Sequence, residues 1–330
     1  MSRRIITAVL MVGIMAASTS KVFAQAEAGV PSLIIPPGAR ANGMGEAYVA
    51  LAQDATAAWW NPGGLAFVKN RQLAFMHTRL VPDLASDVYY EFLGYSNEIS
   101  GVGTFSISLV YLTYGESIAT NDQGEQLGTF VSWEGSVVAS FAIPVSDNFG
   151  LGMSMKFIHV DYAPDTFTTE RQSGSGSSVA LDAGALLTDD ESGFSMGIAV
   201  TNIGPDISFI DHEQSDPLPF TLRTGVAYRL MDDEVNNVIV ALDIEQSLVW
   251  LSDKDIDRAR SEIYHIGAEY RYVNLLSGRM GYIIDEDGDF NAPTYGLGFI
   301  YKDKMSLDYA NVPQAEQLAR VHRWSIYFTF

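Results

Sequence analysis

The chain of 330 residues contains no cysteine and carries few positive charges. Without cysteine, disulfides, thiol catalysis and cysteine metal sites are excluded. Lysine and arginine number 20 against 40 aspartates and glutamates, which gives a formal net charge of −20. So acidic a chain repels phosphate backbones, and we therefore expect no nucleic acid among its partners.

Long hydrophobic runs are also missing beyond the N-terminus, although hydrophobic residues make up 47% of the chain. The N-terminus itself has the layout of a secretory signal peptide. Arg3 and Arg4 precede an apolar run over residues 5–17, which is too short to cross a bilayer as a helix. Small residues then precede a cleavage site after Ala24. Residues 1–24 are thus predicted to be a signal peptide.

From about residue 71, short segments alternate between bulky apolar and small or polar residues. In one of them, Phe105, Ile107 and Leu109 share a face, while Ser106 and Ser108 lie on the other. This period of two predicts β-strands. It fits a soluble sandwich, whose apolar face packs inward, and equally an outer-membrane barrel, whose apolar face meets lipid.

The lengths of the links between segments favour the barrel. Links after odd-numbered strands are mostly long, and links after even-numbered strands are tight turns, as in bacterial barrels with periplasmic turns. We therefore predict an all-β fold, a 14-stranded antiparallel transmembrane β-barrel over residues 71–330, as a multi-pass protein of the cell outer membrane with both termini periplasmic. The predicted strands are 71–80, 89–98, 103–115, 132–143, 149–162, 178–188, 193–203, 220–230, 237–247, 263–273, 277–284, 293–301, 305–310 and 322–330.

One predicted strand changes phase. In 149–162 the bulky residues run through Met155 and Phe157 and then continue at Ile158 and Val160. A β-bulge near Phe157 would explain this slip.

The last strand resembles an assembly signal. Trp324, Ile326, Phe328 and Phe330 share one face, and the chain stops on the aromatic residue. A terminal phenylalanine with apolar residues at alternate upstream positions is similar to the signal that barrel-assembly machinery recognises. That machinery and outer-membrane lipid are therefore expected partners.

Residues 25–70 do not alternate and are rich in small residues. We predict that they form an N-terminal plug, or hatch, inside the barrel, with a helix over 44–58 and a turn at Asn61-Pro62-Gly63 before the first strand. A periplasmic tail is the alternative. The residues expected to matter in the plug are Arg40, Gly43, Gly45, Glu46, Asn61, Pro62 and Gly63.

The plug segment GARANGMGEAYVALAQDATAAWWNPGGLA resembles the hatch of FadL-like outer-membrane barrels, most closely their PorV/PorQ branch. Later phrases, LPFTLRTGVAYRL, IGAEYRYVNLLSGRMGY, YGLGFIY and LDYA, are similar to that branch in order and spacing. Gly63 stands where such hatches usually carry alanine. The resemblance implies a type IX secretion subunit that handles secreted proteins. It also implies a secretion translocon, surface attachment proteins or secreted cargo as partners.

Charged residues fall on the predicted inner face of many strands. They would either line a selective channel or pair with one another and with the plug, and pairing is favoured because buried charges persist when paired. Arg40 and Glu46 are expected to find partners such as Asp243, Glu245 and Arg271. The inward set is Lys156, Asp182, Arg223, Arg229, Asp243, Glu245, Glu269, Arg271, Arg279 and Asp308.

No catalytic or cofactor motif stands out. The acidic run Asp285–Asp289 lacks the spacing of a calcium-binding EF-hand loop and is more typical of a hairpin turn. The five histidines are scattered without metal-ligand spacing. We therefore expect no enzyme, no cofactor and no metal site.

Two functional classes follow from the resemblance. One is a protein-handling subunit of the PorV type, and the alternative is a FadL-like channel for hydrophobic small molecules. The loops around residues 163–176 and 252–262 are polar, whereas an entrance for apolar ligands would expose apolar side chains. This favours the first class.

Overall fold

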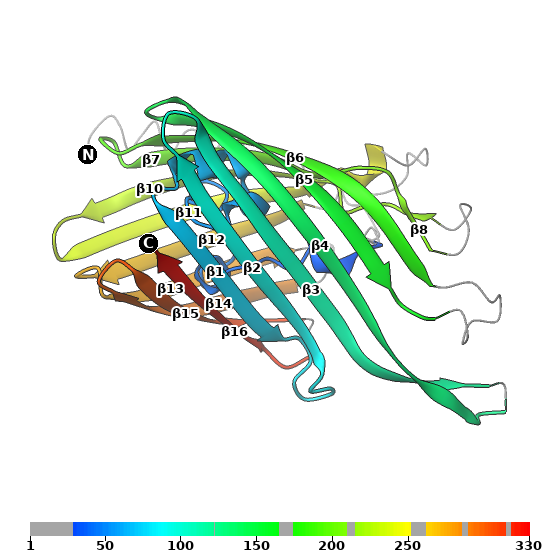
Figure 1. The fold of residues 1–330 in the computed structure, drawn as a ribbon. Coiled ribbons are helices and arrows are strands. Elements are labelled where there is room, and N and C mark those ends of the chain that lie inside the picture. Colours follow the sequence, from blue (N-terminus) through cyan, green and yellow to red (C-terminus); the bar gives the residue numbers. More distant parts are fainter. Residues whose placement is uncertain are drawn as a thin grey trace.

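The computed structural model describes residues 29–121, 123–164, 174–209, 215–251, 262–285, 290–314 and 318–330. Fourteen antiparallel strands form a closed barrel, and β1 pairs with β16 at the seam (Figure 1). The predicted 14-stranded barrel is therefore confirmed. The barrel strands are β1 Arg71–Arg79, β2 Val88–Ile99, β3 Gly103–Thr120, β4 Gln126–Ser146, β5 Phe149–Asp161, β6 Ser175–Asp189, β7 Phe194–Ile203, β10 Thr221–Asp232, β11 Asn236–Ser247, β12 Glu262–Tyr272, β13 Leu276–Asp285, β14 Phe290–Tyr301, β15 Met305–Val312 and β16 Val321–Thr329.

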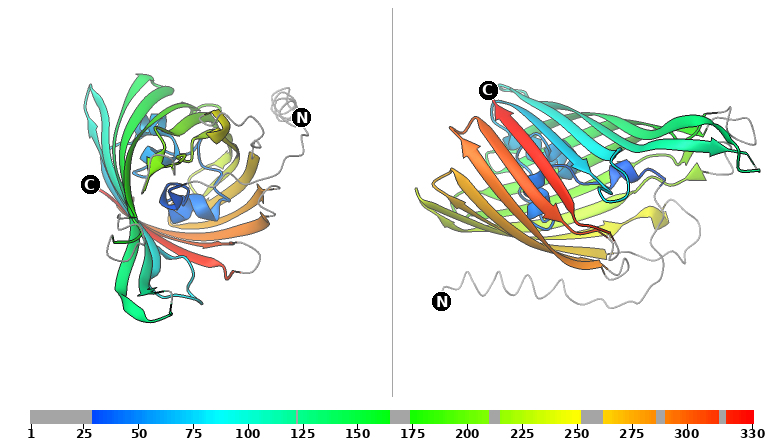
Figure 2. Two further views of the ribbon diagram at one scale, coloured as in Figure 1. Left: turned by 90° about the vertical axis from the view of Figure 1, so that its right-hand side faces the viewer. Right: turned by 90° about the horizontal axis from the view of Figure 1, so that it is seen from below.

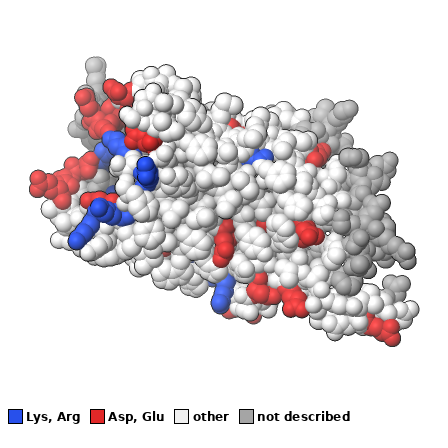
Figure 3. Space-filling view, viewed as in Figure 1, with Lys and Arg blue, Asp and Glu red and all other residues white. Residues whose placement is uncertain are grey.

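Alternation in the strands separates the two faces of the wall. Phe105 and Ile107 on β3 are 40% and 41% exposed, whereas the intervening Ser106 is fully buried. The apolar residues therefore point outward, as in a wall that faces lipid. In Figure 3, charged side chains gather at the short-turn end, and few interrupt the middle of the wall.

Helices contribute little to the fold. Among the described residues, no helix is long and apolar enough to cross a membrane. The helical elements are η1 Pro31–Leu33, α2 Ala39–Gly43, α3 Ala57–Trp60, η2 Pro62–Phe67 and η4 Val249–Leu251.

The β3–β4 hairpin is longer than predicted. Gly115 has a φ of 76°, and the pairing of β3 with β4 shifts register between Thr113 and Glu116. The glycine that was expected to end the strand instead forms a bulge, and the pairing continues to Thr120. The hairpin consequently projects beyond the neighbouring strands (Figure 1).

A small second sheet was not predicted. β8 Ile207–Ser208 pairs with β9 Ser215–Asp216 at the end of the barrel where the long loops lie. We call this the long-loop end and the opposite one the short-turn end.

The predicted bulge near Phe157 is wrong. β5 keeps a continuous register with β6 throughout, and its register with β4 shifts only at Pro144 and Ser146. Ile158 and Val160 instead point inward, where they pack in a buried apolar cluster with Val30 of the N-terminal segment. The change of phase thus reflects apolar residues on both faces of one regular strand.

Candidate functional site: the hatch and the inner wall

Residues 29–68, which we call the hatch, lie inside the barrel. Figure 2 shows their helical elements surrounded by the strands in a view along the barrel. Tyr48, Trp60 and Leu65 form part of a buried cluster there and are each at most 1% exposed. The hatch thus has a core of its own within the lumen.

The predicted helix over 44–58 is wrong. Gly45 and Glu46 have φ angles of 65° and 67°, which turn the chain out of a helix. The amides of Tyr48 and Val49 then donate to one oxygen of Asp243 on β11, at 2.6 and 2.7 Å. A wall carboxylate therefore replaces the carbonyls that a helix would supply.

A second wall carboxylate, Glu269 on β12, binds three arginines. Arg40 of the hatch donates to both of its oxygens, at 2.9 and 3.0 Å. Arg279 and Arg271 donate to the same carboxylate at 2.5 and 3.1 Å. Arg279 also donates to Asp308 at 2.6 Å, so an ion-pair network extends from the hatch to β15.

Tyr48 links this network to the rest of the hatch. Arg40 donates to the Tyr48 hydroxyl at 3.1 Å, and that hydroxyl donates to Asp54 at 2.5 Å. Burial raises the pKa of the Tyr48 phenol well above its ordinary value; Arg40 opposes the shift and Asp54 adds to it. The phenol therefore stays protonated and remains a hydrogen-bond donor.

A third contact joins the aromatic part of the hatch to the wall. The Arg223 guanidinium on β10 lies 4.6 Å from the centre of the Trp59 ring, a cation–π distance. Arg223 also pairs with Glu245 on β11 at 2.8 Å. This contact attaches α3 to the wall at β10.

Other predicted inward charges pair with residues of the wall and not with the hatch. Lys156 and Asp182 pair at 3.0 Å on the inner wall, and Lys156 donates to Asn202, without a direct hydrogen bond to the hatch. Arg229 continues the inward alternation of β10 but lies at the short-turn end, where it pairs with Asp190 and Asp232.

The expected partners of the hatch charges were partly wrong. Arg40 pairs with Glu269 and not with the acids on β11. Glu46 forms no ion pair with the described part of the chain. Asp243 binds backbone amides, because the turn at Gly45 presents two N–H groups to it.

Several hatch glycines meet glycines of the wall. A Cβ at Gly45 would overlap the backbone of Ile266 on β12 and Tyr282 on β13, and a Cβ at Gly281 on β13 would overlap Gly45. Gly43 likewise contacts Gly296, and Gly63 contacts the backbone at Gly184. Backbone therefore packs directly on backbone along this boundary, which leaves no room for side chains.

Asn61 holds the predicted turn. Its side-chain oxygen accepts from the Gly63 amide, and its side-chain nitrogen donates to the carbonyls of Val49 and Ala185. Pro62 begins η2, where proline fits because the first amide of a helix needs no partner. The motif thus connects two parts of the hatch with β6.

Two functional residues escaped the sequence analysis. Glu134 on β4 is fully buried and accepts from the Ser32 amide at 2.8 Å and from the Tyr114 and Tyr162 hydroxyls. Arg323 on β16 donates to the Pro36 carbonyl at 3.0 Å. Both occupy inward positions between outward-facing residues of their strands, and this alternation could have identified them as inward charges.

The described chain begins and ends at opposite ends of the barrel. The Gly29 amide donates to the Pro217 carbonyl at the long-loop end. The Phe330 amide donates to Arg71 at the short-turn end. Gly29 and Phe330 therefore cannot both lie on the periplasmic side of the membrane.

The proposed assembly residues lie at the barrel seam. Trp324, Ile326 and Phe328 on β16 stand opposite His77, Phe75 and Leu73 on β1. Trp324 and Phe330 are 50% and 71% exposed.

Metal ligands do not assemble within the described residues, where no three histidine, aspartate or glutamate side chains could hold an ion. Residues 286–289 of the acidic run Asp285–Asp289 lie outside the described residues, as does the predicted signal peptide 1–24.

The fold is similar to that of solved outer-membrane channels. The toluene transporter TodX of Pseudomonas putida has a TM-score of 0.60 at 14% identity, with 93% of this chain and 98% of that chain covered. The CymD monoaromatic hydrocarbon channel scores 0.54 at 15% identity, with 89% and 97% covered. A Pseudomonas aeruginosa FadL homologue scores 0.52 at 13% identity, with 88% and 97% covered. At these identities the likeness shows a shared fold.

Sequence comparison identifies the family. No curated protein sequence matches the chain significantly. A family model described as Type IX secretion system protein PorV matches residues 18–254, which include the described hatch and the strands β1 to β11. The family is one of type IX secretion, and the fold is shared with barrels of the outer membrane. The chain belongs to the PorV family of type IX secretion system proteins.

Proposed function

We propose that this PorV-family protein serves type IX secretion as a sealed platform in the outer membrane. Exported proteins and other secretion components dock at its long-loop end, and the hatch keeps the lumen closed. The observation that carries the proposal is the attachment of the hatch around the inner wall. Asp243, Glu269 and Arg323 each bind it from a different strand.

The space beside the hatch favours this function over hydrocarbon passage. A cavity of about 280 Å³ lies between the hatch and the wall at the short-turn end. Arg40, Asp54, Arg271 and Asp308 are among its lining residues. A route for apolar molecules would be lined mainly by apolar side chains.

The projecting β3–β4 hairpin offers a docking surface. Ile118, Leu127 and Val131 on it are 61%, 55% and 51% exposed. Exposed apolar clusters outside the lipid zone are typical of protein contact sites. The occupant that suits the family is an exported protein or another secretion subunit.

Orientation follows the rule for bacterial barrels, in which short turns face the periplasm. Phe330 then lies at the periplasmic side and Gly29 near the cell surface. The seam strand β16 would be the element presented to the barrel-assembly machinery.

An engineered disulfide tests the sealed-platform function. Ala39 of the hatch and Ala310 of β15 pack in one buried cluster, and the chain has no cysteine of its own. A double variant, Ala39→Cys with Ala310→Cys, would therefore lock the hatch through a single bond. We expect cargo secretion to be the same in oxidised and reduced cells. Loss of secretion on oxidation, restored by reduction, would contradict a permanently closed lumen.

The same variant tests the alternative function. If the barrel takes up hydrophobic molecules through the lumen, oxidation should block uptake of toluene while cargo secretion continues. Each single cysteine variant is the control for the substitution itself.

A further inference from the structure

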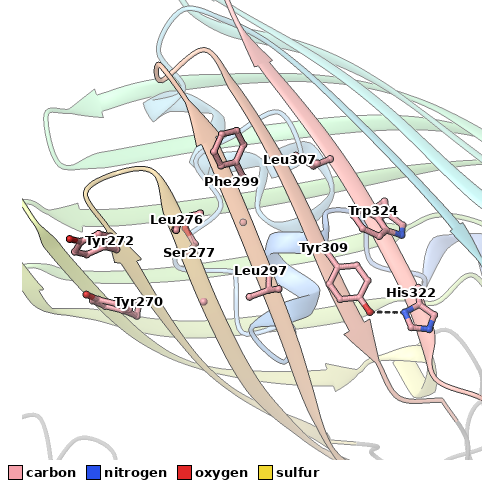
Figure 4. Close-up of a pocket in the computed structure, with 12 residues that line it drawn as sticks. Tyr270, Tyr272, Leu276, Ser277, Leu297, Phe299, Leu307, Tyr309, His322 and Trp324 are labelled. Carbon is pink, nitrogen blue, oxygen red and sulfur yellow. Dashed lines mark hydrogen bonds between the residues drawn. The ribbon is translucent and has the colours of Figure 1, made fainter.

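The outer wall carries a groove away from the proposed docking surface on the β3–β4 hairpin. It has a volume of about 820 Å³ and lies on the lipid-facing side of β12 to β16. Figure 4 shows its side chains, with Tyr272, Leu276 and Phe299 on three successive strands, β12, β13 and β14. The groove is thus continuous with the apolar belt that faces the membrane.

The floor of the groove is an uncovered glycine. Gly278 on β13 faces outward between Tyr270 on β12 and Leu297 on β14. A Cβ at Gly278 would meet no atom within 4 Å. Glycine within a strand weakens it and often marks a place where another molecule approaches closely.

Another outward glycine shows the contrast. A Cβ at Gly135 on β4 would lie 3.1 Å from the Trp133 ring, so that glycine is already covered by an aromatic side chain of its own strand. The floor at Gly278 therefore depends on a molecule from outside the chain for its packing contacts.

Three polar side chains of the groove, Tyr270, Tyr309 and His322, are already bonded within the protein. The Tyr270 hydroxyl donates to Asn236 at 2.8 Å. The Tyr309 hydroxyl and His322 lie 2.6 Å apart in a hydrogen bond that is drawn in Figure 4. Most of the remaining lining consists of ring faces and aliphatic side chains, which suit a hydrocarbon chain.

We propose that this groove is a binding site for an acyl chain of a membrane phospholipid. The outer wall is surrounded by lipid, so an acyl chain can enter the groove without passing through water. Gly278 lies close to the short turn at 273–275. The choice of phospholipid over the lipids of the outer leaflet rests on the proposed orientation, in which that turn is periplasmic.

Filling the groove tests the proposal. The full-length protein would be reconstituted in nanodiscs of phosphatidylethanolamine, extracted in mild detergent and weighed by native mass spectrometry. We expect the unsubstituted protein to retain a phospholipid that Gly278→Leu loses. Ala183→Leu is the matched control, because Ala183 faces outward on β6, away from the groove, and this variant should keep the lipid.

Folding of the variants is checked by heat-modifiable migration. If Gly278→Leu does not fold, Leu297→Trp fills the same groove from β14 and should also lose the lipid. Equal lipid retention in the filled and unsubstituted proteins would overturn the proposal. So would a photo-crosslinker at Leu297 that captures an envelope protein and no lipid, because a protein would then be the occupant.

Discussion

Arg40 of the hatch and Glu269 of β12 form a two-pronged ion pair, with nitrogen–oxygen distances of 2.9 and 3.0 Å. The Glu269 carboxylate is fully buried and also receives Arg271 and Arg279 from the wall. One negative charge therefore holds three guanidinium groups together. Arg279 is also paired with Asp308, whereas Arg40 and Arg271 share Glu269 as their acid.

Replacement of Glu269 by glutamine should destabilise the barrel. The three arginines would then repel one another in a site with little water, at a cost on the order of 3 kcal/mol. The midpoint of heat-modifiable unfolding should fall. Glu191→Gln, on an exposed turn, is the control and should change stability by less than about 0.5 kcal/mol. An equal midpoint for the two variants would contradict this role of Glu269.

Asp243 should control the fit of the hatch. Asp243→Ala leaves the amides of Tyr48 and Val49 without their acceptor, at about 1–3 kcal/mol for each buried group. Asp243→Asn retains one oxygen acceptor and should have a smaller effect. Planar-bilayer recordings should show more frequent conductance steps for the alanine variant than for the asparagine variant. Silent traces from both variants would mean that Asp243 does not control the fit of the hatch.

The two faces of β13 should respond differently to one added methyl group. Gly281→Ala places a Cβ against the backbone of Gly45, whereas Gly278→Ala on the outer face meets nothing within 4 Å. We expect only the first to expose the hatch to added protease. If neither variant alters the cleavage pattern, the glycine contacts do not hold the hatch in place.

The β3–β4 hairpin should matter for partners and not for stability. Leu127→Asp changes a side chain that is 55% exposed, so the unfolding midpoint should stay the same. Co-purification of secretion components or cargo in gentle detergent should decrease. Val145→Asp, at an equally exposed position (55%) near the other end of β4, is the control for the added charge. Unchanged co-purification with Leu127→Asp would mean that the hairpin is not a docking site.

The seam residue Phe330 should matter for assembly. Phe330→Asp leaves the hydrogen bond of its amide to Arg71 available, but it places a charge at an exposed position beside Phe328. We expect less folded protein in the outer membrane and normal export to the periplasm. Cell fractionation with folded and unfolded bands measured separately would reveal this. A normal folded fraction of Phe330→Asp in the outer membrane would mean that assembly does not depend on this side chain.

The barrel could be predicted from the sequence because each strand repeats the same local pattern of outward apolar and inward small residues. The conformation of the hatch could not be predicted, since it depends on groups far away in the sequence. Helix propensity around Tyr48 is overridden by Asp243, which lies almost two hundred positions along the chain. The inward charges were visible in the alternation, but their pairing required the register between strands. Glu269 meets Arg279 because β12 and β13 bring the two side by side.

The path of the hatch has a consequence for the order of folding. Gly29 lies at the long-loop end, and β1 starts from Arg71 at the short-turn end, so the chain runs the length of the barrel before its first strand. A barrel that closed first would have to thread this segment through a nearly full interior. Closure of the seam between β1 and β16 around a hatch already in place needs no threading. The pairing of the first strand with the last is therefore expected to be the step that traps the hatch.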